Sequence, residues 1–445
     1  MEGACPRRIP GDMANSRVIM SGLLLLALSA CGGGNSSSVV PSGSGTGWAA
    51  WAWWRGPSNT GAASSAVTAA NVSTLQQAWA ADLGSPAYGT PAVAGNLVIV
   101  PSLNTLDAVD ATSGAIRWSF TSPEGYKLFS GPTIIGTLVI SSTAYYGAAT
   151  YALDAATGRL AWEKDWGTSY SGYSAAAPVS PGEAVIGLAN QAEPPCSAGA
   201  VIAVNPATGA VLWRHDTTPV FGSGDGVWAA ANVDHLGDVV ATTGNPCASP
   251  DPGEGDAILA LSAQTGQRRW MFTSSEALNG SNSDLDFGST PVDAGGVIVA
   301  ASKSGWVYGL DASSGILMWK YQLSAASCCP ETSGSISSPA WDGSRIYVGG
   351  GSLTNDGTGR FAALRNSGSV LWEDTSPAPV QAPPTISNDL VFVGFGSQEV
   401  ALSTSSGATV WSAATKGYIW AGAAVTGKDV YVASTDGNLY KYALP

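Results

Sequence analysis

Short apolar segments separated by turn residues fill most of the chain, and one unit in its middle shows the pattern clearly. Strand-like segments at 289–292, 296–301, 306–310 and 316–319 are divided there by Gly, Ser and Asp. Apolar runs of this length, bounded by such residues, predict β-strands joined by tight turns. No long segment has the apolar period of a helix, so the pattern predicts an all-β protein.

The end of this unit recurs along the chain. In one copy, Ala-Leu-Asp-Ala-Ala-Thr-Gly at 152–158 leads to Trp162. Degenerate copies lead to Trp118, Trp213, Trp270, Trp319, Trp372 and Trp411. The Thr-Gly or Ser-Gly pair supplies the positive φ that a tight turn needs. Successive Trp residues lie 39 to 57 residues apart, which is the length of a four-stranded propeller blade with its loops.

The two ends of the repeat region complement each other. Residues 75–80 form one strand-like segment that ends near Trp79, without earlier strands of its own. The C-terminus has three strand-like segments, at 422–425, 430–433 and 439–442, without a Trp-closed fourth. Both ends together complete one blade and leave no open edge. The sequence therefore predicts an eight-bladed β-propeller of four-stranded antiparallel blades, closed by its N- and C-terminal strands.

The first 47 residues have the composition of a targeting segment and a tether. Arg17 precedes an apolar run at 19–28 that is too short for a transmembrane helix. The run ends in Leu-Ser-Ala-Cys, which resembles a bacterial lipobox with Cys31 as the lipidated residue. An ordinary secretory signal is the alternative. We expect a lipoprotein signal peptide at 1–31, a flexible Gly/Ser linker at 32–47 and the propeller at 48–445.

The charge of the chain bears on its binding partners, and its cysteines bear on disulfide formation. The chain has 19 basic against 32 acidic residues and no basic patch, so nucleic acid is not an expected partner. Four cysteines remain beyond the leader: Cys196, Cys247, Cys328 and Cys329. An even number in an exported protein predicts disulfides, with the adjacent pair as a vicinal bridge and Cys196 paired to Cys247. The alternative is that some of these thiols stay reduced.

The Asp-Ala-Thr-Gly…Trp units resemble the repeat of quinoproteins. That repeat occurs in eight-bladed alcohol dehydrogenases that use pyrroloquinoline quinone (PQQ) and Ca²⁺, and the resemblance covers the chain from about Trp48. The shorter polyvinyl-alcohol dehydrogenase branch fits best. The repeat also occurs in a non-catalytic lipoprotein that helps to assemble outer-membrane barrels. The resemblance thus implies the fold directly, and PQQ and Ca²⁺ as cofactors only if site residues are present.

The middle of the chain holds candidates for those residues in the family's order. The resemblance implies Glu193, Asn245 in Gly-Asn-Pro, and Asp284 as Ca²⁺ ligands, because Ca²⁺ prefers carboxylate and amide oxygens. It implies Trp228 as the platform under the quinone and Lys303 as the cation beside it. Each of these residues also has a structural alternative, as a loop, core, turn-capping or solvated side chain.

The acidic segment Asp-Leu-Asp-Phe-Gly at 284–288 resembles the part of the family that supplies the general base. We expect Asp284 to remove the alcohol proton, with Asp286 as the substitute. Two departures weaken the match. The adjacent cysteines Cys328 and Cys329 come later in the chain than the family's vicinal pair, and the residues after Glu193 differ from the family's usual context.

The sequence leaves two functions in view. The first is a lipid-anchored enzyme of the cell envelope, at the outer membrane and facing the periplasm, that oxidises a small or polymeric alcohol. It would pass electrons to a separate acceptor such as a cytochrome c. The second is a propeller scaffold that binds partner proteins. The five residues Trp228, Lys303, Glu193, Asn245 and Asp284 favour the first; the lipid anchor, the absence of a haem motif and the displaced cysteines favour the second.

Overall fold

The computed structural model describes residues 65–143, 147–167, 170, 172, 174–189, 199–218, 224–246, 253–274, 285–327 and 333–445. All of them belong to one compact unit that spans 48–445. Within these ranges there is one helical turn, the 3₁₀ helix η1 (Val72–Thr74), and every other regular element is a strand. No described helix could therefore cross a membrane.

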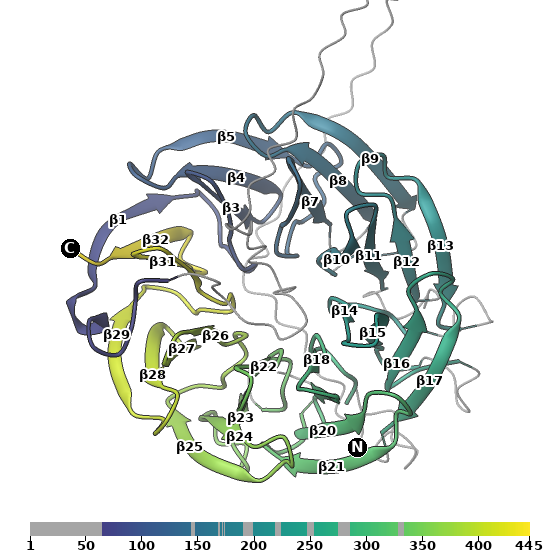
Figure 1. The fold of residues 1–445 in the computed structure, drawn as a ribbon. Helices are drawn as coiled ribbons and strands as arrows, with labels where there is room; N and C mark the ends of the chain where they lie inside the picture. The colour runs from purple at the N-terminus through teal and green to yellow at the C-terminus, as the bar shows by residue number, and fades with distance from the viewer. Residues whose placement is uncertain are drawn as a thin grey trace, which may run out of the picture. The chain divides into compact units, whose positions relative to one another are not determined.

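The strands form eight antiparallel sheets of four, arranged as a ring (Figure 1). Each sheet is one blade, and its strands run from the innermost to the outermost. The first blade has β2 (Ala92–Ala94), β3 (Leu97–Ser102), β4 (Thr105–Asp110) and β5 (Ile116–Thr121), and the second has β6 (Thr133–Ile135), β7 (Leu138–Ser142), β8 (Ala148–Asp154) and β9 (Leu160–Gly167). The third has β10 (Ala177–Ser180), β11 (Glu183–Leu188), β12 (Ala200–Val204) and β13 (Val211–Asp216). The fourth has β14 (Asn232–Val233), β15 (Asp238–Thr242), β16 (Ala257–Ser262) and β17 (Arg268–Thr273).

The next three blades continue in the same order. They are β18 (Val292–Asp293), β19 (Val297–Ala301), β20 (Trp306–Asp311) and β21 (Leu317–Gln322); β22 (Ala340–Trp341), β23 (Ile346–Gly351), β24 (Gly359–Leu364) and β25 (Val370–Ser376); β26 (Thr385–Ser387), β27 (Leu390–Phe395), β28 (Gln398–Ser403) and β29 (Thr409–Ala414). The sheets are those of an eight-bladed β-propeller, as the repeat spacing predicts.

The eighth blade joins the two ends of the repeat region. Its inner strands are β30 (Ala424–Thr426), β31 (Asp429–Ala433) and β32 (Asn438–Ala443), and its outermost strand is β1 (Gln76–Asp82). β1 pairs antiparallel with β32, with Trp79 opposite Lys441. The predicted closure of the ring by its N- and C-terminal strands is confirmed.

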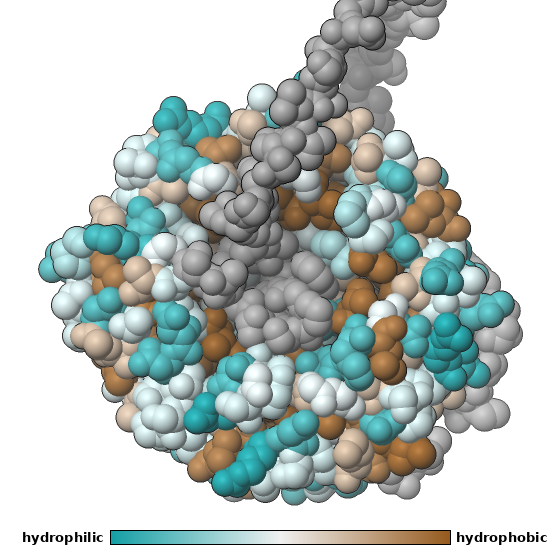
Figure 2. Space-filling model, in the orientation of Figure 1, coloured by the Kyte–Doolittle hydropathy of each residue, from teal (hydrophilic) through white to brown (hydrophobic). Residues whose placement is uncertain are grey.

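Burial explains the run-like apolar pattern. The second and third strands of a blade, such as β19 and β16, are buried along their whole length, while outermost strands such as β21 alternate between exposed and half-buried residues. A blade is covered on both faces by its neighbours, so its middle strands carry apolar residues on both sides. On the face seen in Figure 2, hydrophilic and hydrophobic side chains are mixed over the rim.

The closing Trp of a blade docks on the tight turn of the next blade. In seven junctions the indole N–H donates to a backbone carbonyl there, over 2.6 to 3.3 Å. The donors are Trp79, Trp118, Trp162, Trp213, Trp270, Trp319 and Trp372, and the acceptors are Ala111, Ala155, Pro206, Ala263, Ala312, Asn366 and Thr404. The turn glycine lies against the ring: a Cβ on Gly158 (φ +70°) would lie 2.6 Å from Cδ2 of Trp118. Only a residue without a Cβ, and tolerant of positive φ, fits there.

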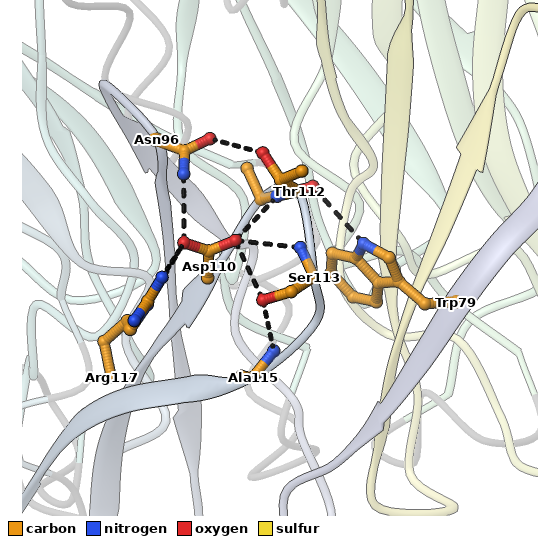
Figure 3. A network of polar contacts seen from close by, with 8 residues as sticks. Trp79, Asn96, Asp110, Thr112, Ser113, Ala115 and Arg117 are labelled. Atoms are coloured by element: carbon orange, nitrogen blue, oxygen red, sulfur yellow. Dashed lines mark hydrogen bonds and ion pairs between the residues drawn. The ribbon is translucent and has the colours of Figure 1, made fainter.

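The Asp of the repeat holds this turn in shape (Figure 3). In the first blade, Oδ1 of Asp110 accepts the N–H groups of Thr112 and Ser113 at 3.0 and 2.8 Å. Its Oδ2 accepts Nδ2 of Asn96 at 3.0 Å and a guanidinium N–H of Arg117 at 2.7 Å. These bonds, that to Arg117 foremost, hold the pKa of Asp110 well below its usual range. These bonds therefore hold the turn that Trp79 contacts in one conformation.

The junction between the seventh and eighth blades is built differently. No tight turn joins β32 to β1, and the indole of Trp411 packs edge-on against Tyr442 of β32 instead, with ring centroids 5.1 Å apart. The segment before β1 covers this junction. Ala66 N–H donates to Gly427 O at 2.6 Å, and Nδ2 of Asn388 donates to Val67 O at 2.7 Å.

The connections fall on two faces of the ring. Tight turns join the first strand to the second and the third to the fourth, and they lie at one end of the strands, which we call the turn face. The links from the second strand to the third, and from one blade to the next, lie at the opposite end, which we call the loop face. The predicted site residues Trp228, Asn245, Asp286 and Lys303 all lie in links of the loop face.

A histidine links the fourth and fifth blades on the turn face. Nδ1 of His235 lies 2.6 Å from Oδ2 of Asp293, and the His235 backbone N–H donates to the same oxygen at 2.8 Å. The hydrogen bond to the Asp293 carboxylate raises the pKa of His235, and the charge of Asp234 adds to the effect. The folded protein therefore favours the protonated imidazole.

Two glycine substitutions in one blade separate backbone strain from the indole contact. Gly136→Ala places a Cβ in open space at φ +62°, so it carries the left-handed penalty alone, about 1–2 kcal/mol. Gly158→Ala adds the clash with Trp118, for which we expect a further loss of about 1–3 kcal/mol. Denaturant unfolding of both variants measures the difference. Equal losses would show that the indole does not require a glycine.

The His235 contact predicts a pH dependence of stability. Because the folded pKa is raised, the contribution is complete below the ordinary His value of about 6.5 and is lost as the pH rises through the folded pKa. The difference in unfolding free energy between the protein and His235→Gln should therefore be larger at about pH 5.5, which is below the ordinary pKa of histidine, than at about pH 9. A difference that stays constant over this range would contradict the assignment.

Candidate functional site

The candidate site is built from four links of the loop face. Trp228 precedes β14 and Asn245 follows β15, both in the fourth blade. Asp286 precedes β18 and Lys303 follows β19, both in the fifth blade. The end of a second strand and the start of a first strand lie at the same end of a blade, so the topology brings residues distant in sequence to one face.

Trp228, Asp286 and Lys303 form one contact cluster. The indole N–H of Trp228 donates to Oδ2 of Asp286 at 2.8 Å. Nζ of Lys303 lies 2.6 Å from Oδ1 of Asp286 and 4.9 Å from the centroid of the Trp228 ring. The side chains of Lys303 and Asp286 are only 10% and 3% exposed. An ammonium group is thus held over an aromatic face by a buried carboxylate, an arrangement in which cation–π attraction is strengthened by desolvation.

Two glycines make room for the indole of Trp228. A Cβ on Gly288 would lie 2.1 Å from Cη2 of Trp228, and a Cβ on Gly244 would lie 3.4 Å from Cδ1 of the same ring. A Cβ on Gly244 would also lie 3.1 Å from Oδ2 of Asp286. The ring is therefore clamped at both ends and by its N–H, which gives a rigid planar surface that remains half-buried.

Asn245 is tied to the same surface through its backbone. Gly244 N–H donates to Gly226 O at 2.7 Å, and Asp225 N–H donates to Asn245 O at 3.2 Å. A bridge between Gly224 and Pro246 extends this pairing. The segment with Gly-Asn-Pro therefore runs antiparallel to the segment that leads into Trp228, and the Asn245 side chain is half-buried beside it.

The other predicted residues lie outside the described ranges. They are Glu193, Asp284, Cys31, Cys196, Cys247, Cys328 and Cys329. Their predicted roles as metal ligand, base, lipidated residue and disulfide partners stay predictions. Among the described residues, no three His, Cys, Asp or Glu side chains gather so as to hold a metal ion. A complete metal site of the predicted kind therefore requires Glu193 and Asp284 in addition to Asn245.

The link that leads into Trp228 contains a residue that the repeat pattern does not single out. Asp225 is fully buried and has a φ of +61°, in the left-handed region that only a few non-glycine residues occupy. Its signal in the sequence is an Asp between two glycines, three residues before Trp228. Such a position points to a special backbone conformation, but the repeat pattern alone assigns it no role.

The described cluster fits a planar, anionic cofactor. The clamped indole offers an aromatic surface, Lys303 offers a cation at its face, and Asn245, on the neighbouring segment, offers a side-chain amide. A quinone with carboxylates uses stacking, a cation for its charge and a bound metal ion. The donor set in the described part is thus consistent with PQQ and, through Asn245, with a hard cation.

Comparisons with known proteins agree with this fold. The PQQ_2 family model, described as outer membrane protein assembly factor BamB, matches residues 63–225 and 197–444. A polyvinylalcohol dehydrogenase of Pseudomonas sp is 25% identical over 414 residues, 78% of this chain and 64% of that protein. The BamB of Yersinia pestis is 27% identical over 285 residues, 60% of this chain and 61% of that protein. The chain thus spans less than two thirds of the length of either relative.

One solved structure supports the fold alone. The protein titled europium-containing methanol dehydrogenase superposes with a TM-score of 0.72 and 17% identity, over 88% of this chain and 98% of that one. An identity this low carries no information on activity, so it supports the eight-bladed architecture and nothing further.

The buried ion pair predicts a large asymmetry between single and double substitutions. Lys303→Met leaves the Asp286 carboxylate buried without its cation, and we expect a loss of about 3–5 kcal/mol in unfolding free energy. Adding Asp286→Asn removes that charge and should restore more than half of the loss, because the amide oxygen still accepts from Trp228. Urea unfolding of the protein, both single variants and the double variant measures the coupling. Additive losses would show that the two charges do not depend on each other.

Proposed function

The chain belongs to the PQQ_2 family, described as outer membrane protein assembly factor BamB, and from this premise we propose that it is an exported quinoprotein that oxidises an alcohol. The cofactors of this proposal are PQQ and Ca²⁺. The substrate is a small or polymeric alcohol, in keeping with the name of the polyvinylalcohol dehydrogenase relative. The observation that carries the proposal is the cluster of Trp228, Asp286 and Lys303 beside Asn245 on the loop face.

Each described residue has one task in this proposal. Trp228 supports the plane of the cofactor, and its clamp by Gly244 and Gly288 removes the entropy of ordering it. Lys303 compensates negative charge on the cofactor in a site largely closed to water, where a fixed cation is most effective. Asn245 supplies an amide oxygen to the cation, together with Glu193 and Asp284. When bound, PQQ supplies a two-electron acceptor for the hydride of the alcohol.

The two carboxylates of 284–286 take different roles in this proposal. Both oxygens of Asp286 are engaged, one by Trp228 and one by Lys303, so it is suited to hold these groups in place. The indole N–H of Trp228 and the ammonium of Lys303 thus already occupy the oxygens that a proton from the alcohol would need. We therefore assign proton removal from the alcohol hydroxyl to Asp284 and a positioning role to Asp286.

The envelope context completes the proposal. Cys31 becomes the lipidated N-terminus once the leader before it is cleaved, and 32–47 is the tether to the outer membrane on its periplasmic side. Electrons leave to a separate acceptor such as a cytochrome c. In this oxidising compartment, Cys196 pairs with Cys247 and Cys328 with Cys329.

Titration of the purified protein with PQQ, with and without Ca²⁺, tests the proposal through Trp fluorescence and dye-coupled alcohol oxidation. We expect Ca²⁺-dependent binding that is weakened at least about 10-fold by Asn245→Ala or Glu193→Ala. Asp284→Asn should bind the cofactor but lower kcat by about 10²–10⁴, because it removes a general base. Europium(III) in place of Ca²⁺ tests whether the site takes a trivalent ion.

Asp356→Asn is the matched control. Asp356 is exposed in the link from the second to the third strand of the sixth blade, where its carboxylate accepts from Ser352, Thr354 and Thr358. This variant should bind and turn over like the unmodified protein. Folded protein that binds no PQQ at about tens of micromolar cofactor contradicts the proposal.

The alternative is a scaffold that binds partner proteins, as the name of the assembly-factor relative suggests. One observation favours it: three consecutive apolar residues, Ile316, Leu317 and Met318, are exposed at the outer rim of the fifth blade, with Ile316 at 66%. Such exposed groups are found at protein interaction sites. Failure to bind PQQ, together with partner binding that is lost in Ile316→Glu, would favour this function.

A further inference from the structure

The left-handed conformation of Asp225 requires an explanation. A non-glycine residue in this region costs about 1–2 kcal/mol, and such strain persists where surrounding contacts enforce it. Asp225 is fully buried, at φ +61°, in the link that leads into Trp228. Glycine stands on both sides of Asp225, and glycine would adopt this conformation without cost, yet this position itself is an aspartate. The aspartate side chain must therefore contribute something that glycine lacks.

The contacts of Asp225 join three segments of the loop face. Its N–H donates to Asn245 O at 3.2 Å, and its carbonyl accepts Oγ1 of Thr217 at 2.7 Å. Its carboxylate Oδ2 accepts the N–H of Glu254 at 3.1 Å. A Cβ on Gly253 would lie 2.0 Å from this oxygen, so the carboxylate is packed tightly against 253–254. Asp225 thus fixes both flanks of the link that contains Asn245.

Glu254 extends these contacts to the outer strands. Its buried carboxylate accepts Nε2 of His215, on β13, at 2.8 Å and pairs with Arg268, on β17. Its carbonyl accepts Oγ1 of Thr243 at 2.5 Å. The Glu254 end of this link is therefore bonded to strands of two blades, which are the rigid elements of this fold, and Thr243 joins the other end of the link to Glu254.

We propose that Asp225 is a positioning residue that holds Asn245 in register with Trp228, so that one cation and one planar cofactor can be bound together. The inference rests on the proposed function. The backbone hydrogen bond from Asp225 positions Asn245, and the short segment from Asp225 to Trp228 positions the indole. The Asp225 carboxylate anchors both residues to 253–254 and, through Glu254, to the outer strands. Such supporting contacts commonly change metal affinity by about 10- to 100-fold.

Asp225→Gly isolates the carboxylate, because glycine keeps the left-handed conformation without strain. In the protein without PQQ, we expect europium(III) luminescence, and its displacement by Ca²⁺, to report an affinity about 10- to 100-fold lower. Amide hydrogen exchange of 243–246 should become faster in the same variant, with no metal present. Asp356→Gly, in the exposed link between β23 and β24 of the sixth blade, is the control and should change neither quantity.

Glu254→Gln provides a second variant should Asp225→Gly fail to fold. It keeps the shape of the side chain and weakens the bonds to His215 and Arg268, so it should change affinity and exchange in the same direction by a smaller factor. Unchanged affinity and unchanged exchange in these variants would overturn the inference. If the unmodified protein binds neither a metal ion nor PQQ, the proposed function fails, and faster exchange in Asp225→Gly would still support the role of Asp225 in holding 243–246.

Discussion

In seven of the eight junctions the indole of the closing Trp meets a glycine of the next blade, and the ring depends on this contact. A blade by itself exposes both of its faces, and only its neighbours can cover them. The contact couples a large apolar surface to a directional N–H bond, as between Trp118 and the carbonyl of Ala155. The glycine must hold positive φ and carry no Cβ, so each blade can be joined to the next in one register only. Repetition of this contact fixes the ring, and the ring fixes where its loops lie.

The loops of the fourth and fifth blades convert this regular frame into a polar site. Asp286 and Lys303 are charges that water would solvate far better than protein, and a buried pair contributes little to net stability. Such a pair is retained where its geometry serves another purpose. Here it orients an ammonium group over the ring of Trp228, and the surrounding blades keep the pair dry. The stability of the repeats thus permits a site that is itself costly to maintain.

The fold could be predicted from the sequence because the sequence unit of each blade is repeated many times. Seven turn-and-Trp copies give the blade length, and the unpaired segments around Trp79 and at the C-terminus identify the closing blade. The residues of the candidate site, in contrast, do not belong to the repeated unit. Trp228, Asn245, Asp286 and Lys303 could be named only by resemblance, and their contacts depend on how long links fold on the loop face. Asp225 was not singled out, because its importance comes from a backbone angle and from bonds to residues 20 and 29 positions away, such as Asn245.

The differently built junction gives the ring a preferred place to open. Between the seventh and eighth blades, an aromatic pair and the segment from Ser65 replace the contact that the other junctions share. Chain ends are where local unfolding starts at the lowest cost. In a ring of eight, this seam lies half a turn from the junction of the third and fourth blades, where Asp225 meets Asn245. Opening at this seam leaves the third, fourth and fifth blades joined by the Trp213 and Trp270 contacts, so the links around Trp228 can keep their shape.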